Sequence, residues 1–254
     1  MTGKRLFALI GIVIAAALAF STPGSLAAEL PPPPTLSTLA SADDLVAQVE
    51  YYVEELEECV EDSEEYEDSV EKIERYSNTL TVVALAIGLH DQDCRLRKAA
   101  PVLIKASQQL ANAKDYATAK SAVSGIKAAL SASGNPTTLK WAKVADLHAL
   151  MEQVPIINAR LKRYMRRFEK GVPYIMGNSA TLVAIAQGSM ANVDETEAPD
   201  KVTEWYKYCI QMRDSAGALN KAVHVKDEDA AKTAWEALQQ SCDDCHAVFH
   251  QDDH

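Results

Sequence analysis

Two cysteines and a histidine near the C-terminus have the types and the spacing that covalent haem attachment needs. They are Cys242, Cys245 and His246, in the segment Ser-Cys-Asp-Asp-Cys-His. Two thiols at this separation can form thioether bonds with the two vinyl groups of one haem, and the adjoining imidazole can coordinate the iron from one face. The spacing therefore predicts one covalently attached haem c, with His246 as the proximal iron ligand.

Three other interpretations of the same residues stay open. A redox dithiol is one, although such a pair typically opens a helix after a strand, whereas this one falls late in an expected helix. A structural zinc site is the second. It needs two further ligands, for which His250 and His254 are the nearest candidates, at an atypical spacing. A chance occurrence of the pattern is the third.

The N-terminal residues have the pattern of a secretory signal peptide. Lys4 and Arg5 precede an apolar run over residues 6–20, and small residues follow it. We expect residues 1–28 to be removed, which places the mature chain in the periplasm or in another exported location. The apolar run is shorter than the roughly 20 residues that span a bilayer, so we expect no membrane span after cleavage.

The elements that position the motif are expected to be helices. Apolar residues recur at helical spacing almost throughout, and the chain has only 4 Phe and 3 Trp. Ser41 and Asp227 have side chains that can accept hydrogen bonds from free backbone amides, so each is expected to start a helix. Residues 29–40, with four consecutive prolines, are expected to form a tether. The expected helices span residues 42–61, 64–90, 95–113, 115–132, 141–167, 172–190, 199–225 and 228–249.

These eight helices divide into two sets of four, and a faint internal repeat supports the division. Asp44-Leu-x-Ala-x-x-Glu50 recurs 102 residues later as Asp146-Leu-x-Ala-x-x-Glu152. Lys114-Asp recurs 112 residues later as Lys226-Asp, and an acidic loop around residues 192–199 accounts for the extra ten residues. We therefore predict an all-α chain with two antiparallel up-and-down four-helix bundles in tandem, over residues 41–134 and 141–250.

The last helix of each half can be compared directly. In the second half, Leu238, Cys242, Cys245/His246 and Phe249 fall on one helical stripe, so that both thiols and the imidazole face the same way. At the aligned positions the first half has Leu130, Ser133 and Gly134, which cannot attach haem. The second half is therefore expected to bind one haem and the first half none.

A helical chain with a signal peptide and Ser-Cys-x-x-Cys-His-x-x-Phe in its last helix resembles the class II c-type cytochromes, the cytochrome c prime family. The resemblance covers residues 141–250, and more distantly 41–134 as a haemless copy. It implies an antiparallel four-helix bundle in which His246 is the proximal ligand and the first helix supplies the distal face. Where members of the family usually have a basic residue after the motif phenylalanine, this chain has His250.

The first helix of the second half offers two candidates for a distal iron ligand. Met151 lies in the apolar stripe Leu147, Leu150, Met151, Val154, and core packing is its alternative role. The resemblance implies that a thioether here makes a six-coordinate iron. His148 is the less favoured candidate because an exposed histidine is the simpler interpretation. A five-coordinate iron with an apolar distal wall is the third possibility.

The remaining cysteines, Cys59, Cys94 and Cys209, are not expected to form a disulfide. Cys59 and Cys94 fall at opposite ends of an expected long helix, whereas a disulfide needs α-carbons within about 7 Å. Cys209 lies in an apolar stripe with Trp205 and Met212 and is expected to be a small buried residue.

Composition and motifs exclude several classes of function. A net charge of −11 makes nucleic acid an improbable partner and favours a basic protein instead. The chain has no Gly-x-Ser-x-Gly, no glycine-rich phosphate loop and no His-Glu-x-x-His, so we do not expect an enzyme. One-electron transfer to a redox partner protein is the leading hypothesis. Binding of nitric oxide or carbon monoxide is the alternative, and a partner-docking role for the first half or a homodimer stays open.

Overall fold

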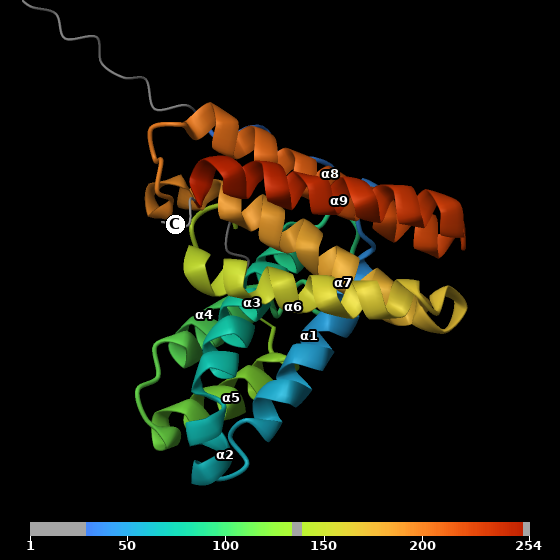
Figure 1. Ribbon diagram of the computed structural model, residues 1–254. Coiled ribbons are helices and arrows are strands. Elements are labelled where there is room, and N and C mark those ends of the chain that lie inside the picture. The colour runs from blue at the N-terminus through green and yellow to red at the C-terminus, as the bar shows by residue number, and fades with distance from the viewer. Residues whose placement is uncertain (1–28, 134–138, 251–254) are drawn as a thin grey trace, which may run out of the picture.

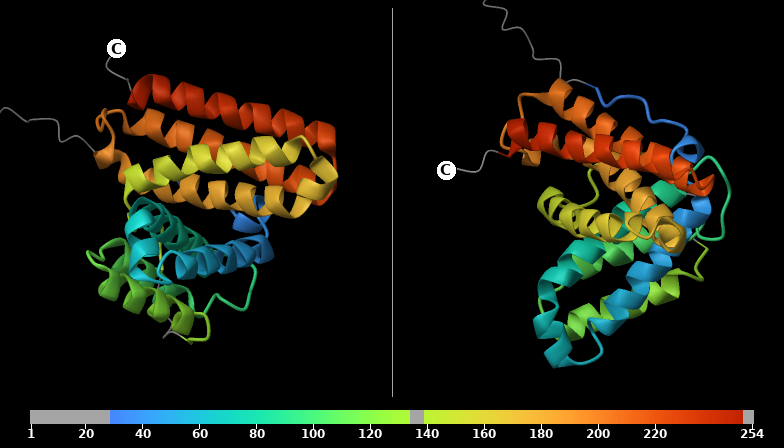
Figure 2. Two further views of the ribbon diagram at one scale, coloured as in Figure 1. Left: turned by 60° about the horizontal axis from the view of Figure 1, so that its bottom comes forward. Right: turned by 45° about the vertical axis from the view of Figure 1, so that its right-hand side comes forward.

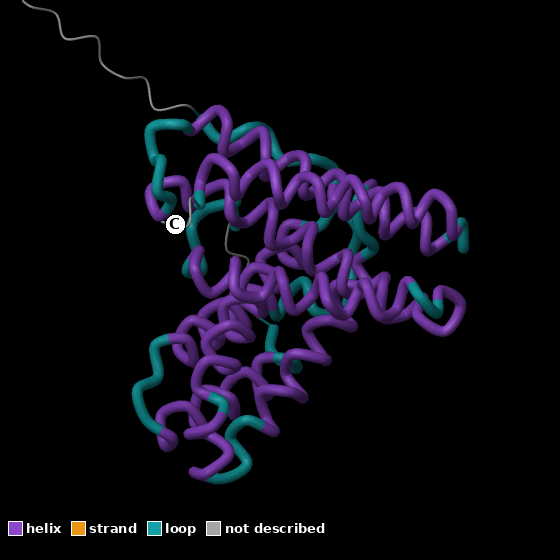
Figure 3. Tube along the Cα trace, viewed as in Figure 1, coloured by secondary structure: helices purple, strands orange, loops and turns teal. Residues whose placement is uncertain are grey.

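The computed structural model describes residues 29–133 and 139–250. Within these residues the chain forms nine α-helices, two short 3-10 helices and no strand (Figure 3). The all-helical prediction is confirmed. The expected signal peptide at 1–28, Gly134 and His254 lie outside the described residues.

The helices of the first half follow the short 3-10 helix η1 (Leu36–Thr38). They are α1 (Ala42–Glu58), α2 (Ser63–Asp68), α3 (Val70–Leu89), α4 (Ala100–Ala111) and α5 (Tyr116–Ala129). The second half contains α6 (Leu147–Met165), α7 (Phe168–Ser189), the 3-10 helix η2 (Met190–Glu195), α8 (Val202–His224) and α9 (Glu228–Phe249).

Helix starts follow the capping signals of the sequence. The Ser41 side chain accepts from the Asp44 amide, and the Asp227 side chain accepts from the Ala230 amide, so both predicted starts are confirmed. Asp115 caps α5 in the same way that Asp227 caps α9, and these two residues are equivalent in the internal repeat. Each of these side chains satisfies a backbone amide that has no partner inside its helix.

Three expected helix boundaries are wrong. The helix expected at 64–90 is interrupted at Ser69, whose φ of −110° and ψ of 7° are not helical, and so becomes α2 and α3. The helix expected from 95 begins at Ala100, because Pro101 has no amide hydrogen and fits only a first turn. The helix expected from 141 begins at Leu147, where Asp146 provides the cap.

In the first half α3 packs on α1 and α4, α4 packs on α5, and α5 also returns to α1. In the second half consecutive helices from α6 to α9 pack against one another. The halves are joined through α6 and α7, which lie between α1–α5 and the pair α8–α9 (Figures 1 and 2). Helix α3 packs on both α6 and α7, and α1 packs on α7. One hydrophobic core cluster consequently runs from Leu36 to Leu238 through both halves.

Residues 36–40, the end of the segment expected to act as a tether, pack into this core. Leu36 and Ala40 are buried, and the Ala40 carbonyl lies 3.1 Å from Nε2 of the buried His90. The backbone of Leu39 crosses α8 at Gly217, where a Cβ would come within 2.6 Å of the Leu39 side chain.

A buried carboxylate ties the start of α1 to α8. Oδ2 of Asp44 accepts from Nδ2 of Asn220 at 3.0 Å and lies 2.7 Å from Nε2 of His224. Because Asp44 is only 7% exposed, these two partners replace the water that the carboxylate loses on folding. They fix the first half against the second.

None of the helices in the described part of the chain combines the length and the apolar character needed to cross a membrane.

The close approach at Gly217 predicts opposite effects for two glycine substitutions in helices. Gly125→Ala on α5 meets nothing within 4 Å and is expected to stabilise the protein by about 0.5–1 kcal/mol. Gly217→Ala forces Leu39 to move and is expected to destabilise it by about 1–3 kcal/mol, less the gain in helix propensity. Thermal unfolding of the two variants measures the difference. Equal stabilisation by both would contradict the packing of residues 36–40.

Candidate functional site

The predicted motif lies in the last two turns of α9, on the face that the sequence stripe indicates. Leu238 and Phe249 on that stripe are buried, and Cys242 and Cys245 are half-buried. His246 is exposed as a residue, but its ring lines the same cavity as the two thiols. The structure therefore brings Cys242, Cys245 and His246 together on one wall.

The cavity has two adjoining parts. The outer part has a volume of about 390 Å³ and is lined by Cys245 and His246 from α9 and by Met151 from α6. The inner part, of about 40 Å³, shares these residues and also reaches Cys242. The outer volume falls in the range of small-molecule sites.

Helices α6 and α9 face each other across this cavity with their backbones well separated, and the Cys242 side chain of α9 reaches Asn158 of α6. The apolar core of the second half is divided accordingly. A small cluster of Leu147, Met190, Trp205, Tyr206, Cys209 and Phe249 surrounds the cavity and is separate from the main core cluster. Met151 packs against both clusters and lines both parts of the cavity. The structure places Met151 opposite the thiols and the imidazole.

His148, the less favoured distal candidate, points outward. Its side chain is 82% exposed, and Nε2 lies 3.4 Å from Oε1 of Glu152, one turn farther along α6. His148 borders only the outer part of the cavity. Its position is that of a residue at the rim.

Helix α8 supplies a third wall that the sequence analysis assigned only to core packing. Trp205, Cys209 and Met212 all line the inner part of the cavity. The indole Nε1 of Trp205 donates to the Ser189 carbonyl at 3.0 Å, and its ring meets that of Phe249 edge-on at 5.2 Å. The signal was present as the helical stripe of these three residues, but the sequence did not show which helix this stripe faces.

All three thiols of the cavity are held in the neutral form. Burial raises the pKa of Cys242, and burial together with the nearby Cys242 raises the pKa of Cys245 to about 11. Burial, with Cys245 nearby, raises the pKa of Cys209 well above its ordinary value. Redox-active dithiols have a depressed thiol pKa, so this environment does not favour the redox-dithiol interpretation.

The zinc interpretation gains no ligand set from the structure. In residues 29–133 and 139–250, no group of three or more His, Cys, Asp or Glu side chains is arranged to hold a metal ion.

The mouth of the cavity is built by η2 and the acidic loop after it. Oε2 of Glu195 accepts from the Leu147 amide and from Nδ2 of Asn192, both at 2.8 Å, and its other oxygen pairs with Lys143. Burial alone would raise the pKa of Glu195, but hydrogen bonds from these three donors lower it below the ordinary value of 4.5. Glu195 thus holds the first turn of α6 in place.

The same loop also reaches the end of α9. Oε1 of Glu197 lies 3.3 Å from Nδ1 of His250, and the His250 ring meets the His246 ring at 5.7 Å. Neither Glu195 nor Glu197 is predicted from the sequence as a site residue, because residues 192–199 indicate there only an extra acidic loop in the repeat.

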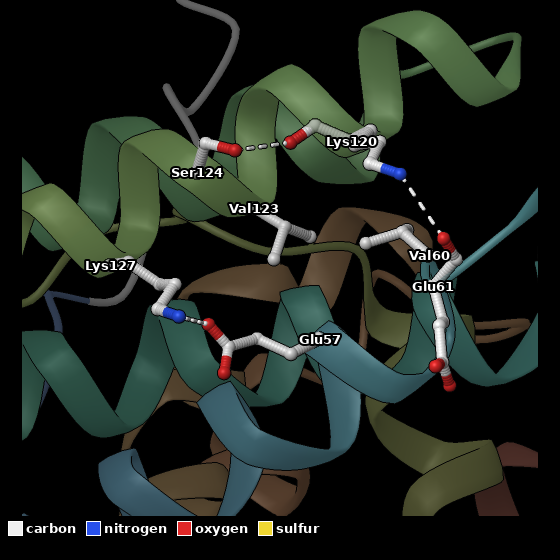
Figure 4. A pocket seen from close by; sticks show the side chains of 7 residues that line it. All are labelled: Glu57, Val60, Glu61, Lys120, Val123, Ser124 and Lys127. Atoms are coloured by element: carbon white, nitrogen blue, oxygen red, sulfur yellow. Dashed lines mark hydrogen bonds and ion pairs between the residues drawn. The ribbon is translucent and has the colours of Figure 1, made fainter.

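The first half has a groove of its own, which is bordered by charged side chains and lies toward the end of α1, away from the positions equivalent to Met151 and Cys242. It lies between α1 and α5, where Lys127 pairs with Glu57 and Nζ of Lys120 donates to the Glu61 carbonyl at 3.1 Å (Figure 4). The groove there is shallow, and α5 ends at Ala129, before the positions equivalent to the haem motif. No thiol or imidazole lines this groove.

All five cysteines of the chain are free thiols. Cys59 and Cys209 are buried and Cys94 is half-buried.

Comparison of the chain with models of protein families, with curated proteins and with solved structures finds no match.

The hydrogen bonds of Glu195 predict a pH-dependent contribution to stability. Because its pKa in the folded state is depressed, the contribution is fully present above pH 4.5 and is lost as the pH falls through the lower folded-state value. Glu195→Gln should therefore cost about 1–3 kcal/mol at pH 7 and much less near pH 3. Urea unfolding of the wild type and the variant at both values measures this. A difference that does not depend on pH would show that the charge of Glu195 is not involved.

Proposed function

We propose that this chain is an exported c-type cytochrome that binds one haem covalently and transfers single electrons. The proposal rests on one observation, which is the set of residues that line the two facing walls of the cavity. Cys242, Cys245 and His246 share one wall, and Met151 lies on the wall opposite. These are the two thiols, the proximal imidazole and the distal thioether that a covalently held haem with two axial ligands requires.

The residues that are present fit this cofactor in type and surroundings. The half-buried thiols of Cys242 and Cys245 would carry the two thioethers, and His246 would coordinate the iron. Trp205 and Phe249 supply aromatic walls, and Leu147 closes the outer end. The first half, which has Leu130 and Ser133 at the positions equivalent to Cys242 and Cys245, would carry no haem.

When bound, the haem supplies an iron that changes between the ferrous and ferric states. The chain itself contributes apolar walls, because Trp205, Cys209 and Phe249 are buried around the site. An iron held by both His246 and Met151 would keep its coordination in both states, which favours electron transfer over ligand binding. Burial and the partners of His246 would tune the reduction potential.

The finer arrangement belongs to the same proposal. We assign residues 41–134 to a haemless four-helix unit, in which α2 and α3 count as one interrupted helix, and 141–250 to a haem-binding unit that resembles the cytochrome c prime family. The signal-peptide pattern of residues 1–28 supports an exported location. The acidic surface supports a basic redox partner.

Removal of the motif thiols tests the covalent attachment. The wild type, produced with a haem-attachment system, should retain its pigment after denaturation and acid–acetone extraction. Cys242→Ser and Cys245→Ser should each keep at most one thioether, and the double variant should lose the pigment. Cys209→Ser is the matched control, since it removes a thiol of the same cavity but should retain covalent haem. Mass spectrometry of the denatured chains gives the result, and a wild type without bound haem would disprove the proposal.

Replacement of Met151 tests the distal side. Met151→Ala should convert a low-spin iron into a high-spin iron that binds carbon monoxide, while Met165→Ala in the same helix should not, because Met165 packs in the main core. His148→Ala should also have no effect, since its side chain is exposed. Absorption and electron spin resonance spectra with and without carbon monoxide measure this. A wild-type ferrous protein that readily binds carbon monoxide would support the alternative function, gas binding.

A further inference from the structure

Helix α6, which carries Met151, packs mainly on helices other than α9, which lies on the far side of the cavity. Its main packing partners are α7 and, from the first half, α3. Figures 1 and 2 show α6 at the boundary between the two halves. The question is which side chains fix its position there.

Three hydrogen bonds join α6 and its N-cap residue to the first half. Oδ1 of Asn78 on α3 accepts from the Asp146 amide at 2.9 Å. Two residues after Met151, Nε2 of Gln153 donates to the Tyr52 hydroxyl at 3.4 Å. Near the end of the helix, the Arg160 guanidinium donates to the Tyr76 hydroxyl at 2.8 Å. These contacts are distributed along the whole length of α6.

The partners in the first half form a rigid aromatic group. Tyr52 is fully buried and Tyr76 is 3% exposed, and their rings meet edge-on at 5.1 Å. Tyr51 completes the group, with its hydroxyl 3.4 Å from that of Tyr76 and its ring 5.3 Å from the Arg160 guanidinium carbon. Buried rings that contact one another in this way have little freedom to move.

The two faces of α6 contact different parts of the molecule. Successive residues of an α-helix are about 100° apart, so Met151 and Gln153 lie on nearly opposite sides. Met151 and Val154 line the haem cavity, whereas Gln153 contacts Tyr52. A shift of α6 on the first half therefore moves Met151 relative to His246.

We propose that the haemless first half positions the distal helix, and that Asn78 and Tyr76 are positioning residues for the distal side of the haem. The inference rests on the proposed function. It gives the first half a role inside the molecule, in place of the docking of a partner.

The test uses the full-length holoprotein with Tyr76→Phe and Asn78→Ala. Tyr76→Phe removes one hydroxyl and leaves the partly buried Arg160 without its hydrogen-bond acceptor. Tyr116→Phe is the matched control, because its hydroxyl donates to the Glu61 carbonyl at 3.2 Å within the first half and away from α6. Each variant is measured for carbon monoxide affinity in the ferrous form and for hydrogen exchange of residues 147–154.

We expect both variants to raise carbon monoxide affinity by about tenfold, since one hydrogen bond to a charged or capping group is worth roughly that factor. Exchange over residues 147–154 should rise as well. Tyr116→Phe should change neither quantity. Carbon monoxide affinities within twofold of the wild type in both variants would overturn the inference, even if both proteins are less stable.

The experiments distinguish failure of the proposed function from failure of the positioning role of Asn78 and Tyr76. A wild type that contains no haem overturns the proposed function before any variant is compared, and it overturns the distal role of Asn78 and Tyr76 as well. Hydrogen exchange on that haem-free chain then decides whether the first half holds α6. Unchanged exchange in both variants would show that it does not.

Discussion

The separation of α6 from α9 is the constraint on which the second half depends. In a closed four-helix bundle the first and last helices support each other through shared apolar side chains. Here a cavity lies between them, so each is held from behind, α9 by α8 and α6 by α7 and α3. The apolar core is consequently divided into a large cluster through both halves and a small one around the cavity. Met151 is the side chain of α6 that contacts both.

Polar groups stabilise the start of α6 together with the buried side chains of Leu147, Ala149 and Leu150. The first amides of this helix have acceptors from three separate elements. Asn78 comes from α3, Asp146 precedes the helix itself, and Glu195 comes from η2. Each satisfies a donor that has no partner inside the helix. The rigidity of the cavity wall that carries Met151 therefore depends on two segments that belong to neither α6 nor α9.

Local signals allowed part of this to be predicted from the sequence. The caps at Ser41 and Asp227 and the stripe that carries Cys242, Cys245 and His246 depend on residues within one or two turns, and the structure agrees with them. The contacts of Leu147 with Glu195 and of Asp146 with Asn78 join residues 48 and 68 positions apart. Periodicity contains no information about such pairs. For the same reason, the stripe of Trp205, Cys209 and Met212 was visible, but not the cavity that it faces.

The contact between Asp44 and His224 has a consequence for how the chain folds. These residues are 180 positions apart, and α1 also packs on α7. Synthesis proceeds from the N-terminus, so the first half is made while the surface that covers α1 does not yet exist. Contacts of such long range form late and slowly, and an apolar surface exposed in the meantime favours aggregation. Mutual repulsion among the acidic residues near the end of α1 and in α2 would keep the partly synthesised chain from aggregating until α7 and α8 have been made.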